Sequence, residues 1–152
     1  NSMIDTLSNG TASLSNAVLF FLGSEIDVTN GFGWSGALVD QTQTLHPIQA
    51  GINANEFSSS NADDFSGIDV YEFYQLAWSA YALAYENGSL FLYYNYQPWE
   101  GETYKDGSKE LMMERVSTFR FMAIGDIIKI QLCVKSELTS EEYSICKEKT
   151  VF

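Results

Sequence analysis

This chain is short, apolar and strongly acidic. Of its 152 residues, 45% are apolar and 18% are charged, a composition that excludes an intrinsically disordered protein. Eight Lys and Arg residues stand against twenty Asp and Glu residues, which gives a formal charge of −12. Because an acidic surface repels phosphate groups, we expect no nucleic-acid partner. The length predicts a single domain over residues 1–152.

An apolar stripe opens the chain and predicts a helix. Its members are spaced by four, seven, four and three residues, which places them on one face of an α-helix over roughly residues 3–22. Asn9 and Gly10 oppose this prediction, because both are poor helix formers and Gly costs about 1 kcal/mol relative to Ala. The longest apolar run, 17–22, is far below the roughly 20 residues of a membrane-spanning helix. The stripe consists of Met3, Leu7, Leu14, Val18 and Phe21.

Residues 23–72 are rich in Gly, Ser, Asn, Thr and Asp, which predicts loops with a few short strands. Within them, residues 31–36 match the G-x-G-x-x-G fingerprint of dinucleotide-binding loops. Such a loop needs a helix after it, whereas residues 37–50 are polar and interrupted by Pro47. A Gly-rich loop is therefore the favoured interpretation.

Two aromatic-rich runs flank Asn87-Gly88, and Asn-Gly is the strongest short-range signal of a β-hairpin. We predict hairpin strands over roughly residues 73–85 and 89–96, within an antiparallel sheet that covers 73–152. A buried helix over 75–85 is the alternative, because that segment contains four alanines.

The C-terminal third alternates apolar and polar residues, as half-buried strands do. We predict strands over residues 116–122, 127–134 and 143–152. In the first of them, Phe119 and Phe121 share one face.

The two cysteines are predicted to form a disulfide. A connection centred on residues 138–141 places Cys133 directly opposite Cys146, at a Cβ separation that suits the bond. The bond closes a loop of about fourteen residues, worth ~3 kcal/mol, and implies an oxidising compartment. In this register Lys147 and Lys149 share a face with apolar residues of the preceding strand. We therefore expect the last strand to diverge or to form a sheet edge.

Candidate catalytic residues are few. His46 is the sole histidine, and no serine lies in a G-x-S-x-G turn, so we predict no Ser-His-Asp triad and no catalytic residue. We expect His46 to be a loop residue with an ordinary hydrogen bond. A pair of carboxylates for glycoside hydrolysis stays open, because its separation in space is not readable from sequence.

Acidic residues in two predicted loops offer oxygen ligands of the kind that Ca²⁺ takes. The first group is Asp63, Asp64 and Asp69, and the second lies at residues 100–106. Neither follows the EF-hand pattern, and acidic loops of so acidic a protein are mostly solvated. We therefore predict no cofactor, with Ca²⁺ at the first group as the alternative.

Aromatic residues cluster between positions 78 and 99. Trp78, Trp99 and the neighbouring tyrosines would suit a sugar-binding platform, although aromatics of an alternating strand are more often core residues. The segment 94–99 is the best candidate for an exposed apolar surface, which is typical of partner contacts. A secreted carbohydrate-binding β module, with or without Ca²⁺, is therefore one functional hypothesis. A small hydrolase built on the acidic loops is another.

A series of motifs in the C-terminal half resembles a known family. The motifs are Tyr74-Gln75-Leu76-Ala77-Trp78, Glu86-Asn87-Gly88-Ser89-Leu90, Tyr93-Tyr94-Asn95-Tyr96-Gln97-Pro98-Trp99, Leu111 to Val116 leading into Ser117-Thr118-Phe119-Arg120-Phe121, Ile128-Lys129-Ile130-Gln131-Leu132-Cys133 and Ser144-Ile145-Cys146-Lys147-Glu148-Lys149. By their order they resemble the pseudopilins and minor pilins of type II secretion and type IV pilus systems, especially the J-type (PilW-like) subunits.

The resemblance implies an α+β fold, in which an N-terminal amphipathic helix packs on an antiparallel sheet that ends in a disulfide-linked hairpin. It implies a non-enzymatic structural subunit that assembles with other pilin-like subunits at a filament tip and has no small-molecule substrate. Such a subunit is periplasmic and held in the inner membrane by a hydrophobic helix, of which residues 3–22 would be the remnant. The residues assigned to partner binding are Met3, Leu7, Leu14, Val18, Phe21, Tyr96 and Trp99.

Overall fold

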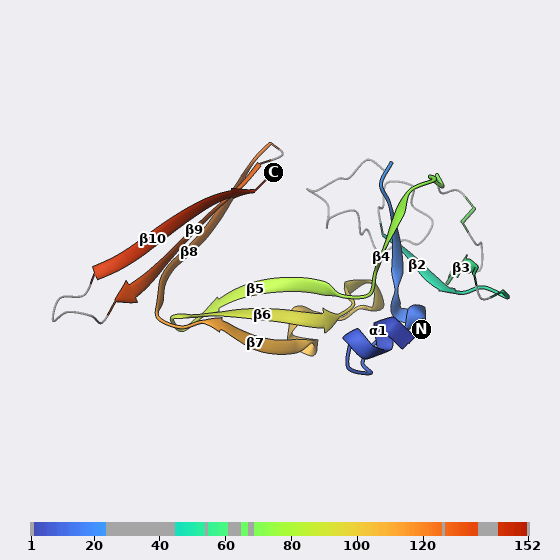
Figure 1. The fold of residues 1–152 in the computed structure, drawn as a ribbon, viewed down its shortest axis with the longest axis horizontal. Helices are drawn as coiled ribbons and strands as arrows, with labels where there is room; N and C mark the ends of the chain where they lie inside the picture. Colours follow the sequence, from blue (N-terminus) through green and yellow to red (C-terminus); the bar gives the residue numbers. More distant parts are fainter. Residues whose placement is uncertain are drawn as a thin grey trace. The chain divides into compact units, whose positions relative to one another are not determined.

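The structure is a computed structural model that describes residues 2–23, 45–53, 55–60, 65–66, 69–125, 127–136 and 143–151. In these ranges the chain forms one short α-helix, a few 3-10 turns and three antiparallel sheets (Figure 1). The helix is α1 (Ser2–Leu7), and the 3-10 turns are Leu14–Asn16, Pro98–Glu100 and Tyr104–Asp106. The strands are β1 (Val18–Phe21), β2 (Leu45–Ala50), β3 (Phe57–Ser59), β4 (Tyr74–Ala77), β5 (Ala80–Glu86), β6 (Ser89–Tyr96), β7 (Ser108–Met113), β8 (Val116–Ile124), β9 (Ile127–Ser136) and β10 (Tyr143–Val151).

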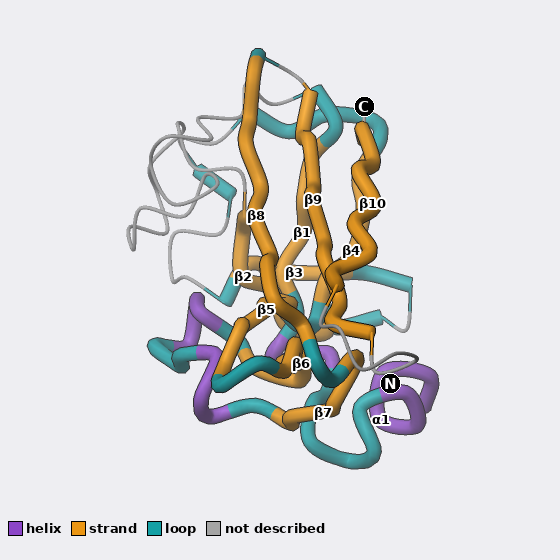
Figure 2. Tube along the Cα trace, turned by 90° about the vertical axis from the view of Figure 1, so that its left-hand side faces the viewer, coloured by secondary structure: helices purple, strands orange, loops and turns teal. Residues whose placement is uncertain are grey.

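The predicted helix over residues 3–22 is wrong. α1 ends at Leu7 (Figure 2), and Asn9 and Gly10 then adopt positive φ angles of 56° and 81°. Glycine takes this left-handed conformation without steric cost, and its conformational entropy already opposes a helix. Residues Val18–Phe21 form β1 instead, because this β-branched and aromatic run pairs on both sides, with β2 and with β4. The helical spacing of the five apolar residues is therefore accidental.

The same finding overturns the α+β fold and the resemblance to pilins. That family lays a long helix on a sheet, whereas α1 has six residues and the described ranges are otherwise dominated by strands. The motifs behind the resemblance are strand-forming and turn-forming segments, and antiparallel proteins of many kinds contain such segments in series. Among the described residues, no helix has the length and apolar character of a membrane span.

The first sheet has the strand order β3-β2-β1-β4 and carries the main hydrophobic core. Leu19 of β1 lies opposite His46 of β2 and opposite Leu76 of β4, so these three side chains share a face. Ile4, Ala12 and Ala17 of the N-terminal segment belong to this core. The predicted helical stripe consisted of other residues of the same segment. The core cluster consists of Ile4, Ala12, Ala17, Leu19, Phe21 and Ile48, with Leu14, Phe65, Leu76 and Trp78 packed against it.

The predicted hairpin around Asn87-Gly88 is confirmed. Its strands β5 and β6 are neighbours in the second sheet, and the two turn residues have φ angles of 49° and 83°. Positive φ at both central residues is what a two-residue type I′ turn requires. The helical alternative for residues 75–85 is wrong, because that segment forms β4 and β5 with a break at Trp78-Ser79. β7 was not among the predicted strands, and it completes the order β5-β6-β7.

The third sheet, named the clipped sheet here, has the order β10-β9-β8. Its three strands were predicted, and β8 and β9 each run two residues beyond the predicted end. Cys133 lies opposite Cys146 and is joined to it by a disulfide, with the two Cα atoms 4.0 Å apart, so the predicted bond is confirmed. The predicted edge is also confirmed, because β10 pairs with β9 and lies at the end of the sheet.

Contacts within the chain divide it into two compact units. The core unit comprises Asn1–Tyr81 and Tyr94–Ser108 and includes the first sheet. The clipped unit comprises Ala82–Tyr93 and Lys109–Phe152 and includes the clipped sheet. The single domain expected over residues 1–152 stays a prediction, and each unit is described by itself below.

Candidate interaction surface

The residues predicted to bind partners at the N-terminus do not form one surface. Met3 and Leu7 lie on α1 with 73% and 60% of their surfaces exposed, whereas Val18 and Phe21 are buried in β1. Because side chains alternate along a strand, Val18 and Phe21 point to opposite faces of the first sheet. Leu14 lies in a 3-10 turn and packs against the core.

The aromatic residues predicted at partner or sugar contacts lie mainly inside the core unit. Tyr96 is buried, and the half-buried Trp99 donates a hydrogen bond from Nε1 to the carbonyl oxygen of Asn16 at 2.7 Å. The carbonyl oxygen of Trp78 accepts a bond from the amide of Gln97 at 2.8 Å. These bonds satisfy polar groups inside the unit, as buried groups require. The segment therefore fixes the loop against the core and is a poor platform for a ligand.

The described residues contain no cluster suited to a metal ion. No three His, Cys, Asp or Glu side chains come together there. Asp69 is exposed, while Asp63 and Asp64 lie outside the described residues, so the Ca²⁺ alternative stays a prediction. In the second acidic group, Asp106 accepts bonds from the backbone N–H and the hydroxyl of Thr103, both at 2.8 Å. These bonds lower the pKa of the Asp106 carboxyl and cap a 3-10 turn.

His46 was expected to be a loop residue with an ordinary hydrogen bond, and this expectation is wrong. It lies on β2 with 2% of its surface exposed, and its ring centroid is 5.4 Å from that of Phe21. Its Nδ1 is buried and has no hydrogen-bond partner among the described residues. Burial disfavours the charged imidazolium, so the pKa of His46 is lowered below its ordinary value. Among the described residues no acidic or nucleophilic side chain is hydrogen-bonded to this histidine, and the expectation that it has no catalytic role stays a prediction.

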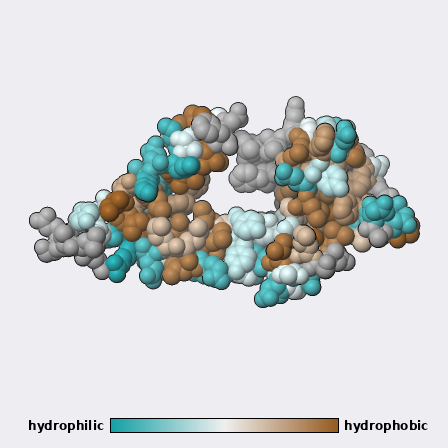
Figure 3. Space-filling view, in the orientation of Figure 1, coloured by the Kyte–Doolittle hydropathy of each residue, from teal (hydrophilic) through white to brown (hydrophobic). Residues whose placement is uncertain are grey.

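One face of the clipped sheet exposes apolar side chains. Phe121, with 74% of its surface exposed, lies in the same row across the strands as Ile130 of β9 and Lys149 of β10. Its ring centroid is 6.4 Å from that of Phe119, the next residue on this face. Figure 3 shows hydrophobic surface over this sheet beside hydrophilic patches. The further exposed members of this apolar face are Ile128, Ile145 and Val151.

Two cations border the apolar face on the edge strand. Lys147 lies opposite Leu132, and Lys149 lies opposite Ile130, as the sequence register predicted. Neither lysine of β10 has a salt-bridge partner among the described residues, whereas Lys109 is paired with Glu86. The sequence pattern places these lysines beside apolar residues but does not show that the apolar face is exposed. A cation opposite an apolar residue was the available signal, because a fully covered face would bury that charge.

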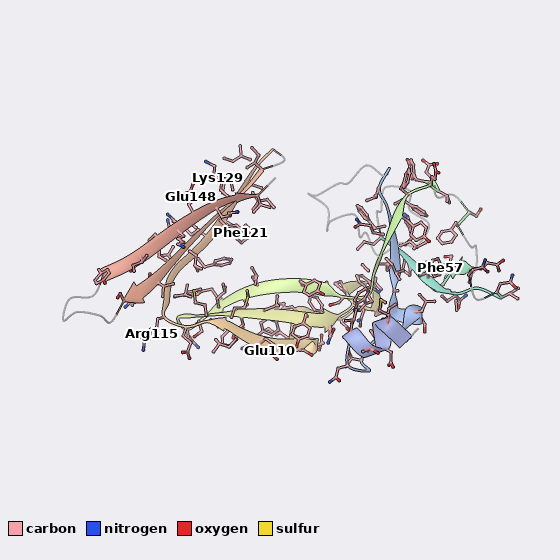
Figure 4. All side chains as sticks on the ribbon, viewed as in Figure 1. Phe57, Glu110, Arg115, Phe121, Lys129 and Glu148 are labelled. Atoms are coloured by element: carbon pink, nitrogen blue, oxygen red, sulfur yellow. A yellow bond between two sulfur atoms is a disulfide. The ribbon has the colours of Figure 1, made fainter. Side chains whose placement is uncertain are left out.

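The opposite face of the clipped sheet carries Arg120, Lys129, Gln131 and Glu148 and is mainly polar, although Met122 and Ile124 are also exposed on it. An open hollow of about 470 Å³ lies along the strands, lined by polar residues of this face and also by Met122 and by Phe121 and Ile130 of the apolar face. Figure 4 shows Lys129 and Glu148 on one side of the sheet and Phe121 on the other. This difference follows from the register, in which Glu148 lies opposite Gln131. The two disulfide cysteines lie on this face, because each directly follows a residue of the apolar face along its strand.

A separate contact network stabilises the hairpin part of the clipped unit. Lys109 forms an ion pair with Glu86 at 2.5 Å, and its Nζ lies 3.9 Å from the ring centroid of Phe91. The hydroxyl of Tyr93 donates to the same carboxylate at 2.7 Å. The hydrogen bond to Glu86 is the main reason that the pKa of Lys109 is raised. Lys109 thus serves an internal contact, unlike the lysines of β10.

Charge is distributed unequally between the two units. The core unit contains twelve Asp and Glu residues and a single basic residue, Lys105, which gives a formal charge of −11. The clipped unit contains eight acidic and seven basic residues, which gives −1. Almost all cations of the chain therefore lie in the unit that exposes the apolar sheet face.

Comparisons with known proteins give no relative. No protein-family model matches the chain, and neither a curated protein nor a solved structure matches it.

Proposed function

We propose that this chain is a non-enzymatic protein that binds a protein partner through the apolar face of its clipped sheet. The observation that carries the proposal is the row formed by Phe121, Ile130 and Lys149, in which an exposed ring and an unpaired cation flank an apolar residue. Exposed apolar patches with a polar border are typical of protein contacts. The disulfide supports a location in an oxidising compartment outside the cytosol.

The energetics favour the face of the sheet over its edge. Full burial of one Val, Ile or Phe side chain stabilises by about 1.5–3 kcal/mol. Roughly half or more of this burial energy stays available for a partner at four positions, namely Phe121, Ile128, Ile145 and Val151. Association itself costs roughly 4–15 kcal/mol, which this energy must offset. By contrast, the free edge of β10 carries Lys147 and Lys149, and lysines on an edge strand discourage backbone pairing with other chains.

The carbohydrate-binding alternative has no comparable support among the described residues. Its proposed platform needs exposed ring faces, whereas Tyr93 and Tyr96 are buried and Trp78 packs against the core. A titration of tryptophan emission with several oligosaccharides tests this alternative, and a flat response would contradict it.

Site-specific photo-cross-linking tests the proposal. A benzophenone side chain replaces Phe121 or, separately, Ile145 in cells that naturally produce the chain. We expect covalent protein adducts at both positions, with the partner identified by mass spectrometry. The control position is Glu110, which is exposed on β7 of the same unit but off the clipped sheet (Figure 4). Absence of adducts, or equal adducts at Glu110, would contradict the proposal.

A further inference from the structure

We infer that the partner is a second copy of this chain, so that the clipped sheet of one copy docks on the core unit of the next. The inference rests on the proposed function and adds the identity of the partner. We call the apolar face of the clipped sheet the donor and the surface that receives it on the next copy the acceptor. On the donor, Phe121 is exposed on the apolar face, and Lys149 lies two strands away in the same row. At a strand spacing of about 4.8 Å, the two positions are roughly 10 Å apart.

The core unit offers a matching acceptor at the hairpin of β2 and β3. An open hollow of about 580 Å³ lies there, lined by Ile52, Glu56 and Phe57 among others. Ile52 is fully exposed, and Phe57 is 37% exposed with its ring edge-on to that of Tyr74, 6.2 Å between centroids. Glu56 is exposed in this lining, and its carboxylate accepts hydrogen bonds from the backbone N–H and the side-chain amide of Asn53 at 3.3 and 2.7 Å. The acceptor thus combines the exposed apolar side chains of Ile52 and Phe57 with a carboxylate, in a lining that also includes Gln49 and Ser58, while the donor combines a ring with an ammonium group.

Charge complementarity favours a second copy as the occupant. The core unit carries −11, whereas the apolar face of the clipped sheet presents Lys147 and Lys149 and, among the described residues, no acid. Two copies of net charge −12 repel one another as wholes. At physiological salt, however, the Debye length is ~8 Å, so the repulsion between charges farther apart than this is largely screened, while the donor and the acceptor are in close contact. This arrangement predicts association that weakens when salt screens the local pair.

The size of the donor face predicts a weak contact. Nine residues of β8 at about 3.3 Å each and three strands at about 4.8 Å spacing describe a face of roughly 30 by 14 Å. Such a face buries roughly 800 Å² in total from both partners, which is below the roughly 1,200 Å² of stable specific interfaces and within the range of weak encounters. We therefore expect a micromolar to millimolar dissociation constant. Because donor and acceptor are different surfaces, the contact is heterologous and each copy keeps one site free for the next.

A complementation experiment with two variants tests the inference. The donor variant carries Phe121→Ser and Lys149→Gln, and the acceptor variant carries Phe57→Ser and Glu56→Gln. Analytical ultracentrifugation of the disulfide-bonded protein is run over a concentration series at low and high salt. We expect the wild type to form oligomers of increasing size, and each variant alone to stay monomeric. An equimolar mixture of the variants restores one intact interface and stops at a heterodimer.

Controls separate loss of contact from loss of fold. The matched control carries Met112→Ser and Glu110→Gln, two exposed positions of β7, and keeps the wild-type association. Far-ultraviolet circular dichroism of each variant checks its folding. A wild type that stays monomeric, a closed dimer that does not grow, or a mixture that stays monomeric overturns the inference.

The two proposals fail separately. Adducts at Phe121 that contain a different protein, together with a monomeric wild type, overturn the second-copy inference and leave the proposed function standing. If no adducts form at Phe121 and Ile145 and the wild type does not self-associate, the proposed function and the second-copy inference are both overturned.

Discussion

In the core unit, a four-stranded sheet lies against a cluster of buried side chains that its own chain supplies, whereas in the clipped unit the β8–β10 sheet leaves an apolar face exposed. Burial contributes roughly 25 cal/mol per Å² of apolar surface. The core unit obtains this term internally, and the clipped sheet obtains less of it and has a disulfide between two strands. Similar alternating strands are thus stabilised from within in one unit and with a cross-link in the other, and the second arrangement leaves apolar side chains exposed.

The largest expected effect is a cavity in the core unit. Ile48 is fully buried, so Ile48→Ala removes packed methyl groups and is expected to cost about 2–5 kcal/mol of unfolding free energy. All three tryptophans, Trp34, Trp78 and Trp99, belong to the core unit, so tryptophan fluorescence during urea unfolding reports on that unit. Ile52→Ala is the control, because Ile52 is fully exposed and its loss should change stability little. Equal losses in the two variants would contradict the assigned core.

The next effect breaks the cross-link of the clipped unit. A double Cys133→Ala and Cys146→Ala variant, or reduction of the wild type, is expected to cost about 3 kcal/mol, because the closed loop restricts the unfolded chain. Hydrogen exchange of the β9 and β10 amides should accelerate, while the tryptophan midpoint stays unchanged. A shift of the tryptophan midpoint by a similar amount would show that the two units unfold together.

A smaller effect concerns the hairpin turn. Gly88 has a φ of 83°, so Gly88→Ala forces a side chain into the left-handed region and should cost about 1 kcal/mol. Gly88→Asn is the matched control, since asparagine tolerates this conformation and should lose less. Chemical denaturation followed by circular dichroism measures both, and equal losses for the two variants would contradict the turn assignment.

The smallest effect is a pH dependence confined to the core unit. Because burial lowers the pKa of His46, the folded protein binds its proton less readily than the unfolded chain does. Stability is therefore fully present above the unfolded pKa of about 6.5 and falls as the pH drops below it. The tryptophan midpoint measured from pH 7.5 to 5.5 should decrease, and His46→Phe should flatten this slope. An unchanged slope in the variant would assign the dependence to carboxylates.

Short-range patterns predicted much of the C-terminal half. The Asn87-Gly88 turn and the cysteine register depend on local geometry, namely positive φ at two positions and a side-chain period of two. The same reasoning placed Lys149 beside Ile130. β7 was missed because its first residues follow a Gly- and Pro-containing loop and three polar or charged residues open the strand.

The N-terminal segment could not be predicted in the same way. Residues 17–21 fit a helical spacing and a strand equally well, and the decision came from β2 and β4, which are distant in sequence. Burial of His46 likewise depends on Phe21 across the sheet. The candidate interaction surface required knowing that the apolar face of the clipped sheet stays exposed, and alternation alone does not say what covers a face.

The position of the cross-link has a consequence for proteolysis. Cys133 and Cys146 enclose the whole connection from β9 to β10. A protease that cuts this connection once leaves the C-terminal fragment tethered by sulfur, so the nicked molecule runs as one band without reductant and as two with it. Such a molecule gains a new amino and a new carboxyl terminus while keeping β10 bound to β9.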